Sequence, residues 1–403
     1  MGIYTFSWPS LRLMVRVSRL REHSDTISAE VELRPMGVGD PLHITRLNLF
    51  STQAKKTLAG HLRAQINSLE WNTLIEQLAQ RTITEYRKGE PVVIIGAHPL
   101  RPGSRWRLEG LIPEGDIALL FGPGGSGKSF LGLAFGMAVS HGWDGLGLKV
   151  EQGPVLYLDW EWGWQEHNDR LLALEAGMDL KFKPSIVYRY CSHEIDNEIE
   201  TIQQIVVDKN IKLVIVDSLV PALGGAKNAK ENAEPLFTSL RSLPGTSALV
   251  ISHTAKDPEA KTRSPYGDVF STNRPRHVIE MRAVSETEGQ LDIALYKHKS
   301  NLPPARLKGL YPIGFRLATG ALGTSLERID VFSVPALAER MGLKGRLLDF
   351  LKLGPATKAA IALALSSSPA QVQARLSELK RAGLLVLLPN SSWALASKEF
   401  DDE

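Results

Sequence analysis

Hydrophobic and polar residues alternate along two stretches near the start of the chain, Leu11 to Leu20 and Thr26 to Arg34. A period of two is typical of strands, and the short polar segment between the stretches predicts a hairpin. Apolar residues then recur with helical spacing from Thr52 to Ile66 and from Trp71 to Arg81. The pattern predicts a small α+β domain over residues 1–97, without residues that point to any particular chemistry.

A different pattern follows the Pro- and Gly-rich stretch from His98 to Ser104. Five apolar runs of strand length alternate with helical patterns, which predicts βαβ units and a mostly parallel sheet covered by helices on both faces. Three more strand candidates lack intervening helices and predict an antiparallel extension. The five runs are Ile117 to Phe121, Val155 to Trp160, Ile186 to Cys191, Leu213 to Asp217 and Ala248 to His253, and the three others are His277 to Ala283, Leu291 to Lys297 and Phe315 to Ala318. We therefore predict an α/β domain over residues 98–335.

The pattern changes again near the end of the chain. Three short helical patterns precede Gly383, and two apolar runs joined by a turn come after it. Three helices and a hairpin predict a winged helix over residues 336–398. Winged helices bind DNA in some proteins and dock other proteins elsewhere, so both roles remain open. Arg375, near the start of the third helix, is the candidate DNA contact.

Composition narrows the class of protein. Of the 403 residues, 43% are hydrophobic and 23% are charged, a balance typical of a globular protein. The net charge of +3 is too small to attract nucleic acid by itself, so any such binding must depend on local basic clusters. The single cysteine, Cys191, excludes an internal disulfide. Because no apolar stretch is long enough to cross a membrane, we expect a cytoplasmic protein without a membrane partner.

One segment carries a motif with defined chemistry. Residues Gly122 to Ser129 read GPGGSGKS and match the Walker A pattern between a predicted strand and a predicted helix. Glycines let backbone N–H groups converge on phosphates, and the following helix directs its positive end at the same charge. Lys128 is expected to contact the β- and γ-phosphates, and Ser129 to bind Mg²⁺. The predicted nucleotide-binding residues are Gly122, Pro123, Gly124, Gly125, Ser126, Gly127, Lys128, Ser129 and Phe130, with ATP and Mg²⁺ as cofactors.

Hydrolysis requires acids beside that loop. The apolar run from Leu213 ends in Asp217, a Walker B pattern, and we assign Asp217 to the metal together with Ser129. The run from Val155 leads to Asp159 and Glu161, and we expect this strand to lie beside the phosphate loop. Glu161 follows the strand, at the end where α/β proteins build their sites, and is our candidate for the base that activates water. Asp159 is the rival.

With these motifs, the sequence from Trp106 to Leu322 resembles the RecA-like ring ATPases. It is most similar to the RepA-like hexameric helicases of plasmids, with wider similarity to DnaB-type helicases and KaiC. The resemblance rests on the Walker A segment, the strand Leu156 to Glu161 and the segments Val250 to Lys256 and Tyr296 to Asn301. It implies a hexameric ring that acts on single-stranded DNA with replication proteins as possible partners.

The resemblance also implies roles for three further residues. His253 stands at the position of the family's γ-phosphate sensor, although a buried histidine without a catalytic role remains an alternative. Lys297 and Lys299 stand in the segment that reaches into a neighbouring subunit's site. Since they flank His298, we expect both to project from one strand face, and a solvated basic edge strand is the alternative. Lys299 replaces an arginine of many relatives and cannot make a bidentate contact.

Two loops of such rings contact single-stranded DNA, and here they correspond to residues 220–231 and 255–276. A flexible surface loop is the alternative for the second. With the winged helix included, the predicted DNA-binding residues are Lys256, Lys261, Arg263, Arg274, Arg276 and Arg375. Three functions therefore compete: an ATP-driven helicase of plasmid or phage type, an ATPase that loads or remodels DNA complexes without unwinding, and a nucleotide-gated DNA-binding regulator.

Overall fold

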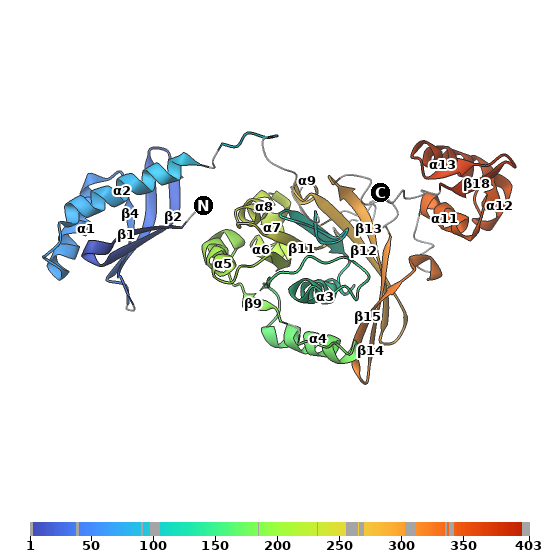
Figure 1. Ribbon diagram of the computed structural model, residues 1–403, viewed down its shortest axis with the longest axis horizontal. Coiled ribbons are helices and arrows are strands. Elements are labelled where there is room, and N and C mark those ends of the chain that lie inside the picture. Colours follow the sequence, from blue (N-terminus) through green and yellow to red (C-terminus); the bar gives the residue numbers. More distant parts are fainter. Residues whose placement is uncertain are drawn as a thin grey trace. The chain divides into compact units, whose positions relative to one another are not determined.

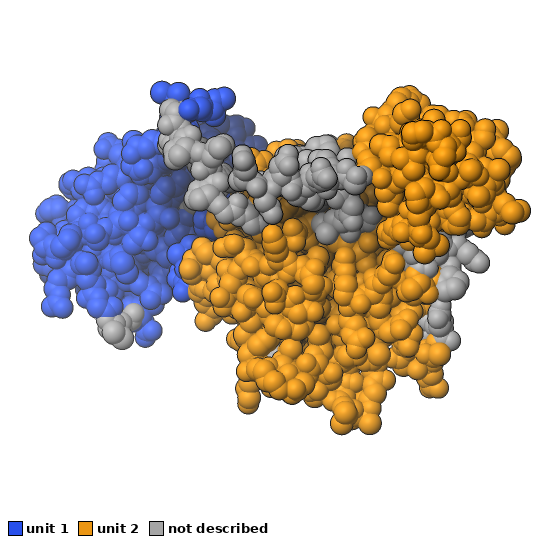
Figure 2. Space-filling model, turned by 45° about the vertical axis from the view of Figure 1, so that its right-hand side comes forward, with its two compact units in different colours: residues 1–103, 195–208, 242–244 blue, residues 104–194, 209–241, 245–403 orange. Residues whose placement is uncertain are grey.

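The computed structural model describes residues 3–37, 40–89, 92–96, 105–183, 185–231, 233–254, 265, 270–302, 312–334, 337 and 342–396. The chain divides into two compact units, which Figure 2 shows in different colours. Unit 1 comprises residues 1–103, 195–208 and 242–244, and unit 2 comprises the remaining residues.

Unit 1 contains a four-stranded antiparallel sheet in the order β1-β2-β3-β4. Alternate side chains of the long strands β2 and β3 are buried against the helices α1 and α2, in a core that includes the buried indole of Trp71. The predicted hairpin and both helices are present, and β1 and β4 are strands that the pattern did not predict. The bounds are β1 Tyr4–Trp8, β2 Leu13–His23, β3 Thr26–Pro35, β4 His43–Asn48, α1 Thr52–Gln65 and α2 Trp71–Lys88, with a 3₁₀ turn at Pro9–Leu11 and helix α5 at Ile195–Asp208.

Unit 2 is built on a nine-stranded sheet in the order β15-β14-β13-β12-β7-β11-β10-β8-β9. The six strands from β12 to β9 in this order are mutually parallel, and β13, β14 and β15 continue the sheet antiparallel. The bounds are β7 Ile117–Gly122, β8 Val155–Asp159, β9 Val187–Tyr190, β10 Leu213–Asp217, β11 Ser247–His253, β12 His277–Thr287, β13 Gln290–Ser300, β14 Ile313–Gly320 and β15 Gly323–Ile329. Unit 2 is therefore a mixed α/β structure with a sheet that is largely parallel, consistent with a RecA-like core.

Helices cover this sheet, with α3 and α4 on one face and α8 on the other (Figure 1). Helix α3 lies close to the strands because two of its residues are glycines that face them. A Cβ on Gly132 would lie 2.9 Å from Cδ1 of Ile251, and one on Gly136 would lie 3.0 Å from Cδ1 of Ile215. The bounds are α3 Lys128–His141, α4 Trp164–Gly177, α6 Leu219–Ala222, α7 Ala226–Glu231, α8 Glu234–Arg241 and α9 Phe270–Asn273, and a two-stranded sheet pairs β5 Trp106–Leu108 with β6 Ile112–Pro113.

Two expectations about this sheet were wrong. Strand β12, expected in the antiparallel extension, pairs parallel with β7, and only the strands after it are antiparallel. Strand β8 does not lie beside the strand of the phosphate loop, because β11 and β10 separate it from β7. Hydrophobic patterns identify strands, but the order of strands depends on crossover connections that bring distant segments together.

The carboxyl-terminal part of unit 2 forms three helices and a three-stranded sheet in the order β16-β18-β17. The three predicted helices and the predicted hairpin are present, and they share an apolar core that includes Leu347, Leu376 and Trp393. The bounds are α11 Leu343–Phe350, α12 Lys358–Ala364, α13 Pro369–Arg381, β16 Ala356–Thr357, β17 Leu385–Leu387 and β18 Ser392–Leu395, with 3₁₀ turns at Val331–Ser333 and Leu351–Leu353. Among the helices of the described residues, none combines the length and apolar character of a membrane span.

Candidate nucleotide site

The phosphate-binding loop joins the buried strand β7 to the N-terminus of α3. Pro123 O accepts hydrogen bonds from Ser126 Oγ at 2.8 Å and from Lys128 Nζ at 2.6 Å, so the lysine folds back over its own loop. Gly127 has a φ of +85°, and a Cβ there would lie 3.2 Å from Cδ2 of Leu291. Only glycine combines this backbone conformation with so little space. The loop is thus shaped as the Walker A pattern requires.

Lys128 is almost completely buried, with 5% of its surface exposed. Burial lowers the pKa of its ammonium to about 8, although the carboxylates of Asp217 and Glu161 raise it. These two acids come from the ends of β10 and β8. The fold therefore brings the Walker A lysine and both predicted acids into one electrostatic neighbourhood.

Asp217 lies at the end of β10 with 2% of its surface exposed. Tyr157 donates its hydroxyl proton to Asp217 Oδ2 at 2.5 Å. Burial raises the pKa of Asp217, while hydrogen bonds from Tyr157 and from Ser129 lower it. A hydroxyl and a carboxylate in contact are oxygen ligands that suit Mg²⁺. Ser129 and Asp217 therefore fit the metal of a bound Mg-nucleotide.

Glu161 and Asp159 have very different surroundings, although they are two residues apart. Glu161 is exposed, and its Oε1 accepts a hydrogen bond from Ser218 Oγ at 2.6 Å. Asp159 is fully buried and accepts hydrogen bonds from the backbone N–H groups of Glu161 at 2.9 Å and Trp162 at 3.2 Å. Glu161 is thus the carboxylate with access to solvent beside Lys128. Ser218 was missed in the sequence, although its place directly after the Walker B acid was a usable signal.

His253 ends β11, where it pairs in register with Gly122 of the phosphate loop. Its Nδ1 lies 4.0 Å from the position that a Cβ would take on Gly124. The imidazole therefore stands against the Walker A loop.

The two candidate trans-acting lysines do not share a strand face as expected. Lys297 pairs with Ile279 and Lys299 with the adjacent Val278, because a β-bulge at His298 interrupts the register. Val278 and Ile279 are consecutive in β12 and therefore point to opposite faces of the sheet. Their partners Lys299 and Lys297 point to opposite faces as well. Lys297 is exposed. Lys299 instead donates to three backbone carbonyls around the end of α9, those of Thr272, Asn273 and Pro275 at 2.9, 2.8 and 3.1 Å.

The predicted DNA-binding residues are only partly within the described part of the chain. Arg274 pairs with Glu234, Arg276 with Asp116 at 3.1 Å, and Arg375 with Glu378 at 2.8 Å. Lys256, Lys261 and Arg263 lie outside the described residues. The expected loop 220–231 is folded mainly into the short helices α6 and α7.

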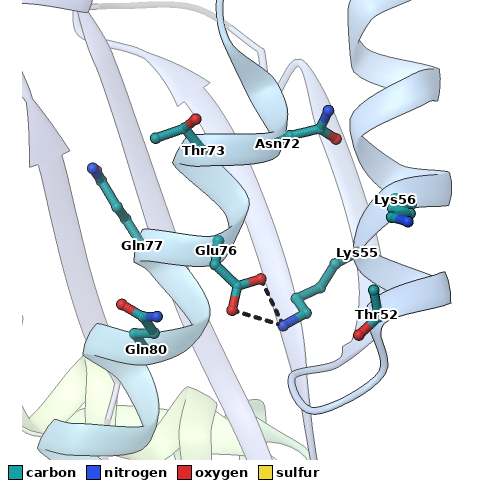
Figure 3. Close-up of a pocket in the computed structure, with 8 residues that line it drawn as sticks. All are labelled: Thr52, Lys55, Lys56, Asn72, Thr73, Glu76, Gln77 and Gln80. Atoms are coloured by element: carbon teal, nitrogen blue, oxygen red, sulfur yellow. Dashed lines mark hydrogen bonds and ion pairs between the residues drawn. The ribbon is translucent and has the colours of Figure 1, made fainter.

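Unit 1 contains a polar groove between α1 and α2, shown in Figure 3. An ion pair joins Lys55 Nζ to Glu76 Oε2 at 2.7 Å within it. The other lining residues are Thr52, Lys56, Asn72, Thr73, Gln77 and Gln80. No predicted site residue lies in this groove, and the candidate nucleotide site belongs to unit 2.

Comparison with known proteins bears on this site. Residues 84–259 match the family model described as AAA domain, and this segment contains the Walker A loop, Glu161, Asp217 and His253. The match supports a P-loop ATPase. No curated protein matches the sequence. Among solved structures, the KaiC-like protein of the archaeon Pyrococcus horikoshii OT3 is similar to this chain with 16% identity and a TM-score of 0.39. The similar region covers 57% of this chain and 99% of that chain.

The buried lysine of this P-loop predicts a pH-dependent affinity for ATP. In the nucleotide-free protein Lys128 loses its proton as the pH rises through about 8, whereas contact with phosphate favours the charged form. Binding above pH 8 must therefore take up a proton. We expect the affinity for Mg-ATP to fall about tenfold between pH 7 and pH 9, which follows if phosphate contact restores the lysine's usual pKa.

Titration calorimetry in two buffers of different ionisation enthalpy measures both the affinity and the proton uptake at pH 8.5. The variant Lys128→Arg is the control, because a guanidinium stays charged over this range and should show no uptake. An equal proton uptake by both proteins would contradict the role of Lys128.

Proposed function

We propose that this P-loop ATPase is a ring-forming motor on single-stranded DNA, a replicative DNA helicase of plasmid or phage type. The proposed ATP hydrolysis is supported by one observation. Lys128, Ser129, Asp217 and Glu161 come together at the carboxyl ends of three parallel strands. One buried cation, one hydroxyl and two acids of different exposure are the groups that phosphoryl transfer to water requires.

In this proposal each residue has a separate task. Backbone N–H groups of the loop and Lys128 hold the β- and γ-phosphates, and Ser129 and Asp217 hold Mg²⁺, which neutralises charge on the phosphate oxygens when bound. Glu161 takes a proton from the attacking water, whose oxygen forms the new bond to the γ-phosphorus while the bond to ADP breaks. His253 contacts the γ-phosphate region and reports its loss to the segment that follows β11.

The position of Lys297 favours action in a neighbouring subunit. Leu291, at the start of β13, lies against Gly127 of the phosphate loop. Lys297 follows six residues later on the same strand, so it lies about 20 Å from the loop of its own chain. A lysine at that distance does not reach its own nucleotide. Its exposed ammonium is available to a second copy of the chain, which supports a ring with sites between subunits.

For DNA contact, the described candidates are arginines that form exposed ion pairs. Such pairs contribute about 0–1 kcal/mol, so exchange of a carboxylate for a nucleic-acid phosphate costs little. Arg274 and Arg276 directly follow α9, which comes after the strand β11 that ends in the proposed phosphate sensor His253. This location lets a change at His253 be transmitted to the DNA-binding segment.

A second candidate function rests on the carboxyl-terminal helices. Helix α13 presents Gln371 and Arg375 on its exposed side near its N-terminus, followed by the strands β17 and β18. If these helices and strands form a winged helix that binds duplex DNA in a sequence-specific way, the protein is a DNA-binding regulator controlled by nucleotide. A loader that remodels DNA complexes is the remaining alternative.

One experiment separates these functions. We expect ATP hydrolysis by the full chain to be stimulated at least tenfold by single-stranded DNA, with displacement of a strand from a forked duplex, and Lys128→Ala to abolish both. Stimulation without displacement indicates the loader. Slow hydrolysis that single strands do not stimulate, with tight binding to duplex, contradicts the motor and indicates the regulator.

A further inference from the structure

Asp159 is a buried carboxylate that the proposed chemistry does not use. Its exposed fraction is 0%, and its charge is satisfied entirely by the protein. Burial pushes its pKa upward, but hydrogen bonds from His167, from backbone N–H groups and from Tyr188 outweigh that effect and lower its pKa overall. The group is therefore an anion at neutral pH, held away from water.

The hydrogen bonds of Asp159 converge on the loop that carries Glu161. Its Oδ1 accepts the N–H of Glu161 at 2.9 Å and that of Trp162 at 3.2 Å. The hydroxyl of Tyr188 lies 2.9 Å from Asp159 Oδ2 and 3.0 Å from Trp162 O, and it shares its one proton between these two acceptors. The backbone N–H groups of Glu161 and of the next residue are thus both held by the fixed charge of Asp159.

Two further contacts fix the carboxylate and the start of the loop. His167 of α4 donates from Nε2 to Asp159 Oδ2 at 2.9 Å, since an ionised carboxylate can only accept. The backbone N–H of Trp160 donates to Asp217 O at 2.9 Å, which ties the loop to the strand that carries the proposed metal ligand. Charge-assisted bonds in a dry interior are stronger and shorter than bonds exposed to water.

We propose that Asp159, held by His167 and Tyr188, is a positioning residue that fixes the Glu161 carboxylate at the distance from Asp217 and Lys128 that hydrolysis needs. Asp159 is fully buried and acts only through the backbone of Glu161, so the inference rests on Glu161 being the base of the proposed function. Displacement of a catalytic group by about 1 Å costs on the order of 10²-fold in rate, which makes such a clamp consequential.

The test is the variant Asp159→Asn, which preserves side-chain size but replaces one acceptor oxygen by a donor and removes the charge. We expect kcat for ATP hydrolysis to fall by about tenfold to 100-fold, as for other supports of catalytic groups, with the Kd for Mg-ATP changed less than about twofold. Asp169→Asn is the matched control, because Asp169 is an exposed acid of α4 outside this network, and it should hydrolyse ATP at the wild-type rate.

A double-mutant cycle distinguishes positioning from general stabilisation. If Asp159 acts only through Glu161, the double variant Asp159→Asn with Glu161→Gln is no slower than Glu161→Gln alone. Independent, multiplying losses overturn the proposal, as does a wild-type kcat in Asp159→Asn. Should Asp159→Asn fail to fold, Tyr188→Phe and His167→Gln each remove one support and are expected to lower kcat severalfold with unchanged Kd. Rapid turnover in Glu161→Gln alone contradicts the proposed function, whereas an inactive Glu161→Gln beside a fully active Asp159→Asn contradicts this inference only.

Discussion

The variant Glu161→Gln is expected to hydrolyse ATP about 10²- to 10³-fold more slowly than the wild-type protein while binding Mg-ATP with nearly unchanged affinity. The amide keeps the size of the side chain and its contact with Ser218 Oγ, but it cannot take a proton from water. Ground-state binding depends on the loop amides, Lys128 and the metal-binding pair, which the substitution leaves intact. Phosphate release and equilibrium binding of a fluorescent ATP analogue measure the two quantities.

Glu166→Gln is the control for this experiment. Glu166 lies five residues later in α4, is exposed and pairs with Arg170, so the same chemical change removes only a surface ion pair. We expect its turnover to equal that of the wild type. Wild-type turnover in Glu161→Gln shows that another group is the base. Loss of ATP affinity in that variant assigns Glu161 to binding instead.

The second large effect is expected from Lys297→Ala, which should lower turnover by about 10²-fold without weakening ATP binding. Arginines supplied by a neighbouring subunit or partner contribute 10³- to 10⁵-fold in related chemistry, and a lysine without bidentate geometry contributes less. Lys209→Ala is the control, because Lys209 is an exposed lysine at the end of α5 away from any proposed site.

Mixing two inactive proteins tests whether the lysine acts between subunits. A subunit carrying Lys297→Ala retains Glu161, and a subunit carrying Glu161→Gln retains Lys297, so a mixed ring contains some sites with both groups. We expect the mixture to regain turnover that neither variant shows alone. A mixture that stays inactive although the two proteins co-assemble indicates that Lys297 acts in its own chain or does not act in hydrolysis.

Lys299 illustrates how neighbouring residues of one motif diverge in the folded chain. A two-residue spacing predicted a common face for Lys297 and Lys299, and the extra residue of the bulge at His298 reversed that relation. The resulting face gives Lys299 three carbonyl partners near α9, and burial is the largest cause of its lowered pKa, followed by the nearby Arg276 and Arg241. Bulges depend on the pairing of two strands, so one strand's sequence does not reveal them.

The contrast between Asp159 and Glu161 was equally inaccessible from the sequence. Both acids follow the same apolar run, and alternation places them on one side of the strand. What separates them is the donors around Asp159, which come from α4, β9 and the following loop. Tyr157 and Ser218 gained their contacts with the acids in the same way, through pairing of β8 with β10.

The sequence by itself determined what depends on neighbours along the chain. It determined the phosphate loop between strand and helix, the acids at strand ends, the alternation of strands and helices, and the helices and hairpin near the carboxyl end. These features follow from local backbone preferences and hydrophobic periodicity. Only the tertiary structure decided the strand order, the parallel direction of β12, the opposite faces of the two lysines and which carboxylate is buried. Those depend on residues far apart in sequence, whose burial and hydrogen bonds exist only once the sheet has formed.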